Sequence, residues 1–172
     1  KSHQKLNLNY KLDVIYGDPG ILAPLLWKKS HNNKKFELGI ILHYVDNNSK
    51  IVKNFVKKYQ NNIVLINILD NVESIIDQIS KCEYVMSSSL HGLICAEAYG
   101  IPVIRLIASD KIIGGDFKFD DFRMGIGAPK YSKIYSHELS SVNLQDIKNK
   151  CSVFSVIENQ KKILDLRNKI KL

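Results

Sequence analysis

The sequence predicts an α/β protein of Rossmann-like type, with a three-layer α/β/α architecture around one parallel sheet. Up to residue 107, short apolar stretches alternate with stretches whose apolar residues repeat at helical spacing. The links between them are short, which favours parallel strands joined by right-handed crossovers. The chain has 172 residues, 45% of them hydrophobic, enough for one core and too few for two ordinary domains. We therefore expect a single domain over residues 1–172.

The first elements follow from local signals. A strand is predicted over 11–17, and Asp18 then stands where it can cap a helix with Pro19 at its first position. Pro24 lies further along, so this helix should be short or kinked. A second strand is predicted over 35–46, and its almost wholly apolar sequence is typical of a strand covered on both faces.

The same alternation continues to residue 107. The next elements are a helix over 47–60 capped by Asn48 or Ser49, a strand over 62–68, a helix over 70–82, a strand over 83–86, a helix over 90–100 ending at a glycine, and a strand over 101–107. From this alternation we expect five parallel strands in the order 3-2-1-4-5. The segment after 107 has no clean period, and two helices, near 142–151 and 156–170, are predicted to close the domain.

Polar residues gather where the predicted strands end. In an open parallel sheet, ligands bind outside the carboxyl ends of the strands. The side chains expected at this edge are Asp18, His43, Asn67, Ser87, Ser88, Ser89 and His91. The serines precede a helix, whose N-terminal N–H groups attract anions. His91 falls in its first turn, where helix polarity is expected to lower its pKa. Gly92 leaves room for a neighbouring backbone or a ligand.

Each of these residues also has an ordinary structural interpretation. A serine such as Ser89 before a helix is usually only a cap, and an isolated histidine such as His43 or His91 is more often structural than catalytic. Their combination at one edge of one sheet favours a functional site. The chain has no GxGxxG or Walker sequence, so dinucleotide and P-loop sites are poorly supported.

Composition limits the partners. The formal net charge of +8 suits anionic partners, but the lysines are scattered and only three arginines are present, so a nucleic-acid module is not indicated. Three cysteines without CxxC spacing argue against disulfide and zinc frameworks and fit a cytoplasmic setting. No metal site is expected. The sequence starts without methionine, and we expect it to be part of a longer protein.

Four stretches together resemble one known family. They are "YGDPGILAPLL" at 16–26, "GIILHYVD" at 39–46, "SSSLHGLICAEAYGIPVI" at 87–104 and "GGDFKFDDF" at 114–122. In this order they resemble the polysaccharide pyruvyl transferase family, over about residues 12–125. The resemblance implies a GT-B-type protein with two facing Rossmann-like halves, of which this chain would be the C-terminal half and an N-terminal domain would be missing.

The resemblance also implies a reaction. Such enzymes transfer a pyruvyl group from phosphoenolpyruvate to two hydroxyls of a sugar, in a surface polysaccharide or its lipid-linked precursor, and form a ketal without a further cofactor. His91 would then be the acid/base. The remaining donor-binding residues would be Asp18, His43, Asn67, Ser87, Ser88, Ser89, Leu90, Gly92 and Lys118. Lys118 is preferred over Arg123 because it lies within the matched segment. Some members carry a basic residue where this chain has Ser89, so part of the anion-binding charge must come from elsewhere.

Other functions stay open at this point. A GT-B glycosyltransferase would bind a nucleotide sugar in the same crevice, but the acidic residue expected to hold its ribose is not evident, since Glu97 lies a full helix away. A non-catalytic glycan-binding or partner-binding module is the third possibility. We expect a cytoplasmic protein, and the lysine-rich face of the helix over 156–170 would either be solvated or approach the inner face of an anionic membrane.

Overall fold

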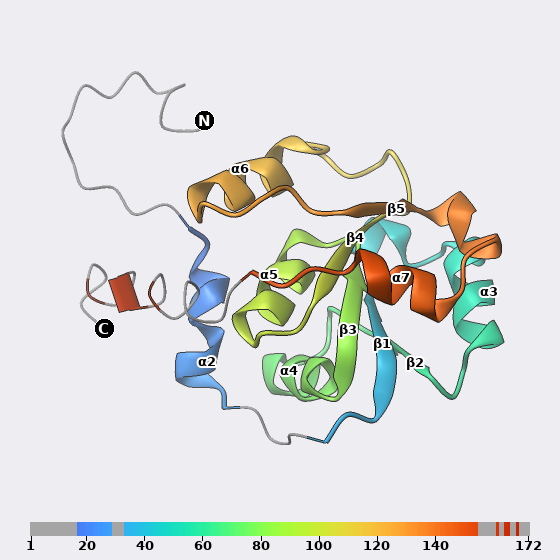
Figure 1. Cartoon of the computed structure of the whole chain (residues 1–172), viewed down its shortest axis with the longest axis horizontal. Coiled ribbons are helices and arrows are strands. Elements are labelled where there is room, and N and C mark those ends of the chain that lie inside the picture. The colour runs from blue at the N-terminus through green and yellow to red at the C-terminus, as the bar shows by residue number, and fades with distance from the viewer. Residues whose placement is uncertain (1–16, 29–32, 155–160, 162–163, 166–167, 169–172) are drawn as a thin grey trace.

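A five-stranded sheet forms the centre of the computed structural model, which describes residues 17–28, 33–154, 161, 164, 165 and 168 (Figure 1). The strands are β1 (Phe36–Ile41), β2 (Ile63–Ile66), β3 (Cys82–Ser87), β4 (Val103–Ile107) and β5 (Lys133–Tyr135). Their order is β2-β1-β3-β4-β5, and every neighbouring pair is parallel. The predicted α/β class with a parallel sheet is therefore confirmed.

Helices cover both faces of this sheet. The α-helices are α2 (Ala23–Leu26), α3 (Lys50–Lys58), α4 (Val72–Ser80), α5 (Leu90–Ala98), α6 (Phe117–Gly125) and α7 (Leu144–Lys150), and the 3-10 helices are η1 (Pro19–Leu22), η2 (Tyr44–Asp46) and η3 (Ser136–Ser140). Figure 1 shows α4 and α5 on one side of the sheet and α3 and α7 on the other. This is the expected three-layer arrangement.

Two apolar cores hold the layers together. Between the sheet and α4, α5 and α6, the first core buries residues such as Ile76, Leu93 and Phe119. Between the opposite face of the sheet and α3, η3 and α7, the second core contains Phe55 and Ile147. Because strand side chains alternate between the two faces, the central strands are apolar at nearly every position, as their sequences predict.

The predicted strand order is wrong. It inserted a strand over 11–17 between the strands now labelled β1 and β3, but these two pair directly, with Leu38 opposite Tyr84. No further strand fits between them. Of 11–17, only Gly17 lies within the described residues. The fifth strand is instead β5, whose three residues are too few to carry a periodic signal.

Most helix boundaries follow from the capping residues that the sequence offers. The Asp18 carboxylate accepts a hydrogen bond from Gly20 N at 2.8 Å, Ser49 caps α3, and Gly100 follows α5 with a φ of 69°. The short, proline-interrupted helix after Asp18 is confirmed as η1 and α2. The helix predicted over 142–151 is α7, whereas the one predicted over 156–170 lies largely outside the described residues. Within the part of the chain that is described, no helix is long and apolar enough to cross a membrane.

The register aligns several side chains near the carboxyl end of the sheet. Ile41 is opposite Ser87, Ser87 is opposite Arg105, and Arg105 is opposite Lys133. Residues in register share a face of the sheet. Since Val85 and Val103 lie in the first core, Ser87 and Arg105, each two residues further along, face the same side as α5 and α6.

Candidate active site

The junction between β3 and α5 is built by two buried serines. Ser87 ends β3, and its hydroxyl accepts a hydrogen bond from Ser89 N at 3.0 Å and lies within hydrogen-bonding distance of the carbonyls of Ile41 (2.8 Å) and Ser89 (2.9 Å). The hydroxyls of Ser87 and Ser88 are both inaccessible to solvent. They shape the turn from within, and anion binding through these two hydroxyls stays a prediction.

A buried carboxylate connects Ser88 to two other loops. Ser88 Oγ donates to Asp46 Oδ2 at 2.7 Å and accepts from His43 N at 2.9 Å. Ser109 Oγ donates to the other Asp46 oxygen at 2.5 Å. Asp46 is only 3% exposed, and hydrogen bonds to both of its oxygens satisfy this buried side chain. One side chain thus links the segments that follow β1, β3 and β4.

The N-terminus of α5 faces this edge without a side-chain cap. Ser89 occupies the N-cap position in extended backbone conformation, but its side chain makes no capping hydrogen bond. Leu90 and His91 begin the helix, and Gly92, its third residue, lies against the sheet with Ser87 Oγ and Ile41 close by. The first-turn N–H groups therefore receive no bond from the N-cap side chain, which suits them to an anionic ligand.

His91 projects from this first turn beside a carboxylate. Its Nε2 atom lies 3.5 Å from Asp18 Oδ2, and the imidazole is 72% exposed. The interaction with Asp18 raises the pKa of His91, outweighing partial burial and the repulsion by Lys118. In return, His91 lowers the pKa of Asp18. The expectation that the pKa of His91 would be lowered is therefore wrong, because the nearby Asp18 carboxylate raises it.

Basic residues of α6 are divided between the site and the core. Lys118 lies in the first turn of α6, close enough to His91 for its charge to oppose protonation of the imidazole. Arg123 is almost fully buried on the same helix and is paired with Glu97, while Tyr131 Oη donates to Glu97 Oε2 at 2.6 Å. Arg123 therefore belongs to the core, and anion binding by Lys118 stays a prediction. Burial raises the pKa of Glu97.

Comparison with known sequences covers the segments that build this site. The family model described as polysaccharide pyruvyl transferase matches residues 1–111, which include Asp18, His43 and the β3–α5 junction.

The chain belongs to the polysaccharide pyruvyl transferase family.

One curated relative is an uncharacterized protein of Acanthamoeba polyphaga mimivirus. It is 31% identical over 141 residues, which cover 79% of this chain and 49% of the relative. The chain therefore spans about half the length of this relative. No solved structure gives a significant match. Membership makes the chain part of a family of transferases whose name implies a polysaccharide acceptor.

In this member of the pyruvyl transferase family, the side chains of two predicted donor-binding residues, His43 and Asn67, form hydrogen bonds within their own loops. His43 caps η2, with Val45 N donating to its Nδ1 at 3.4 Å, and its ring packs 4.5 Å from that of Tyr44. Asn67 follows β2 and is exposed, with its side chain bonded to Asp70 and to Leu69 N. Because β1 separates β2 from β3, Asn67 is not brought to the α5 N-terminus.

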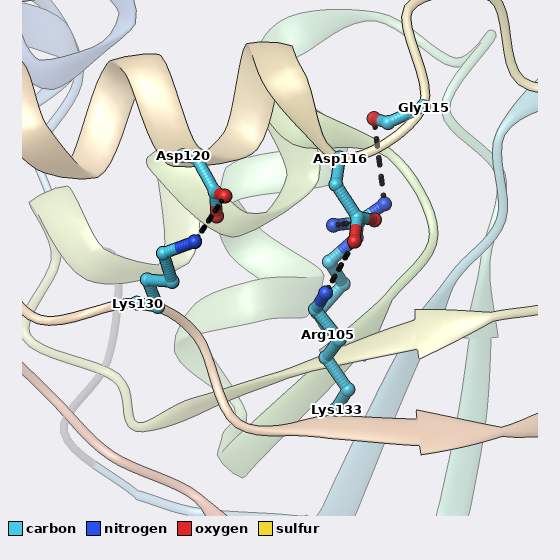
Figure 2. Close-up of polar contacts among 6 residues, drawn as sticks. All are labelled: Arg105, Gly115, Asp116, Asp120, Lys130 and Lys133. Carbon is cyan, nitrogen blue, oxygen red and sulfur yellow. Dashed lines mark hydrogen bonds and ion pairs between the residues drawn. The ribbon is translucent and has the colours of Figure 1, made fainter.

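The sequence did not predict a group of charged side chains near the carboxyl end of the sheet. Arg105 of β4, Asp116 before α6 and Lys133 of β5 meet there (Figure 2). The signal was a single arginine within the apolar strand "IPVIRLI", where a charge needs a partner. The sequence also did not predict that Asp46 would be buried and hydrogen-bonded to Ser88 and Ser109. Among the described residues, no group of three or more His, Cys, Asp or Glu side chains is arranged to hold a metal ion.

Proposed function

We propose that this chain supplies the donor-binding half of an enzyme that transfers pyruvyl groups from phosphoenolpyruvate. The acceptor is a sugar of a surface polysaccharide or of its lipid-linked precursor, and the reaction takes place in the cytoplasm. The observation that carries the proposal is the His91–Asp18 pair at the uncapped N-terminus of α5, within the segment that matches the family. It combines a proton donor with N–H groups suited to an anion.

The reaction balances without a cofactor. The methylene carbon of phosphoenolpyruvate takes a proton and becomes a methyl group, and a sugar hydroxyl oxygen attacks the adjacent carbon. The C–O bond to phosphate breaks, and the electron pair leaves with phosphate. A second sugar hydroxyl then attacks the same carbon and closes the ketal. Of the two hydroxyl protons released, one replaces the proton used and the other is carried by the hydrogen phosphate product.

The residues of the site have distinct roles in this scheme. His91 is the general acid, and the raised pKa that Asp18 gives it increases its protonated fraction near neutral pH. Asp18 orients the imidazole and stabilises its charged form. The α5 N–H groups and Lys118 bind the anionic donor. We expect the isolated half to bind the donor without turning it over at the rate of the intact enzyme, since a GT-B site lies between two halves.

Substitution of His91 tests the proposal in the full-length protein. His91→Ala should reduce acceptor-dependent phosphate release from phosphoenolpyruvate by about 100- to 10,000-fold. Because the side chain is largely exposed, the free energy of unfolding should change by no more than about 0.5 kcal/mol. His137→Ala, at an exposed histidine of η3, is the matched control and should leave turnover unchanged. Near-normal turnover in His91→Ala would contradict the assignment.

Binding measurements distinguish the donor from its main alternative. Titration of the full-length protein with phosphoenolpyruvate and with nucleotide sugars should give saturable binding of phosphoenolpyruvate alone. The burial of Glu97 with Arg123 supports this expectation, because that carboxylate is not available to a ribose. Saturable binding of a nucleotide sugar without binding of phosphoenolpyruvate would favour glycosyl transfer instead.

A further inference from the structure

A second group of charges lies at the start of α6 (Figure 2). The Arg105 side chain is only 4% exposed, and its Nη1 atom lies 2.7 Å from Asp116 Oδ1. The other carboxylate oxygen of Asp116 is 2.5 Å from Lys133 Nζ. The Asp116 carboxylate thus bridges two cations that come from neighbouring strands, β4 and β5.

The guanidinium of Arg105 is incompletely satisfied by this arrangement. Within the described part of the chain, its buried Nε and Nη1 atoms have no partner in a properly directed hydrogen bond, although Nη1 is close to Asp116. Its Nη2 atom donates to Gly115 O at 3.5 Å, the outer limit for such a bond. Buried arginine donors are normally paired, so these donors call for a ligand or another explanation. The Phe119 ring, 3.6 Å from the guanidinium carbon, stacks on the group and leaves its edge to an acceptor.

The Asp116 side chain lies on an exposed segment, from which it can move away from Arg105 and Lys133. Its side chain is 55% exposed, and it makes no capping hydrogen bond although it occupies the N-cap position of α6. The residues on either side of it, from Ile113 to Phe117, are exposed as well, so no buried side chain anchors this turn. Segments with few buried contacts open at low free-energy cost. An exposed carboxylate on such a segment can be displaced by an anionic group of a ligand.

The position of this group connects it with the His91 site. Asp116 and Lys118 lie at the start of the same helix, and the charge of Lys118 reaches His91. Arg105 is opposite Ser87 in the sheet and faces the same side as α5. Both sets of cations therefore border one region at the carboxyl edge of the sheet.

We propose that Arg105 and Lys133 form a phosphate-binding subsite, which Asp116 occupies in the ligand-free protein and from which the phosphate of the substrate displaces it. Two cations match the charge of a phosphate dianion better than that of one carboxylate, and the fork of an arginine suits phosphate oxygens. The inference rests on the proposed function in taking phosphoenolpyruvate as the donor. It also gives a source for the positive charge that some family members are expected to carry at the position of Ser89.

Replacing Asp116 in the full-length protein provides the decisive test. Asp116→Asn keeps the size of the side chain but removes its charge. Titration with inorganic phosphate should then show binding about three- to tenfold tighter, because the competing carboxylate no longer reduces the fraction of open subsite. Arg105→Lys and Lys133→Gln should weaken it. Asp120→Asn is the control, since Asp120 lies on the same helix but pairs with Lys130, at 2.6 Å, and its loss should change phosphate binding much less than Asp116→Asn does.

The outcomes separate a binding role from a structural one. In phosphate-free buffer, Asp116→Asn should lower the melting temperature, and added phosphate should restore it. Unchanged or weaker phosphate binding in this variant, or a loss of stability that phosphate does not restore, would overturn the proposal. This holds even if Arg105→Lys fails to fold, because Lys133→Gln and Asp116→Asn still decide.

Phosphoenolpyruvate provides the second arm of the experiment. If the affinity for inorganic phosphate changes with these substitutions as expected but phosphoenolpyruvate does not bind, the subsite is supported and the proposed donor is wrong. If phosphoenolpyruvate binds and is turned over but Asp116→Asn leaves the affinity for inorganic phosphate unchanged, the proposed function is supported and the subsite is wrong. Pyruvate, which offers only a carboxylate, should gain less affinity from Asp116→Asn than inorganic phosphate does.

Discussion

Replacing Gly92 by alanine should destabilise the protein measurably. A Cβ atom at this position would lie 2.5 Å from Ser87 Oγ and 2.9 Å from Ile41 Cγ2. Both neighbours are fully buried, and the hydroxyl is fixed by its bonds to Ile41 O and Ser89 N, so neither can move without cost. The methyl group would therefore push α5 away from the sheet or break the turn that Ser87 holds.

The size of the effect follows from three contributions. Overpacking of a well-packed core costs about 1–3 kcal/mol. Loss of one Ser87 hydrogen bond costs about 1 kcal/mol more. Alanine is the better helix former by about 1 kcal/mol, which offsets part of this. The net loss in free energy of unfolding is about 2 kcal/mol, equivalent to about 4–8 °C in melting temperature for a domain of this size.

Thermal and urea unfolding of Gly92→Ala measure this loss directly. The double variant Ser87→Ala/Gly92→Ala provides the control, because it removes the hydroxyl that the new methyl group meets. It should be less destabilised than the sum of the single variants, by about 0.5 kcal/mol or more. A melting temperature for Gly92→Ala equal to or above that of the unchanged protein would refute the close approach of α5 to the sheet.

Three further predictions follow from the contacts described above. Asp18→Asn should lower the pKa of His91 in an NMR titration, and an unchanged pKa would mean that the pair is not formed in solution. In the unchanged protein, the pair should stabilise the fold only between the two pKa values. This stabilisation should be lost as pH rises through the raised pKa of His91 and as pH falls through the lowered pKa of Asp18. Arg123→Leu leaves the Glu97 carboxylate buried without its cation and should cost about 3–5 kcal/mol in urea unfolding, whereas a loss below about 1 kcal/mol would contradict this. Ser80→Ala removes a buried hydroxyl that lacks a hydrogen-bond partner in the described structure, so its melting temperature should stay the same or rise, and a marked fall would show that the hydroxyl is bonded.

The parts of the fold that the sequence predicted are those set by local signals. The strands from β1 to β4 appear as apolar runs, and the helices between them begin at residues such as Ser49 and Asn71 whose side chains cap the backbone. Asp18 acts as a cap for the same reason. Strand order is not a local property, and it was predicted wrongly because β1 and β3 pair directly, which no residue pattern within either strand reveals.

The candidate site was predicted only in outline. The sequence indicated which residues stand at the carboxyl ends of the strands, but not whether their side chains point inward or outward. Ser88 bonds to Asp46, and His91 meets a carboxylate from a distant part of the chain, so its pKa moves opposite to the expected direction. Arg105 and Asp116 become partners only when β4 and α6 are packed together.

The bond between Asp46 and the hydroxyls of Ser88 and Ser109 has a consequence for how this edge of the sheet can evolve. Each oxygen of one buried carboxylate serves a different loop, so a change in either serine alters the partner on which the other depends. Substitutions in the two loops should therefore show epistasis, with the effect of one set by the residue present at the other. Through Asp46, the loops that follow β1, β3 and β4 are therefore expected to change together in evolution rather than one at a time.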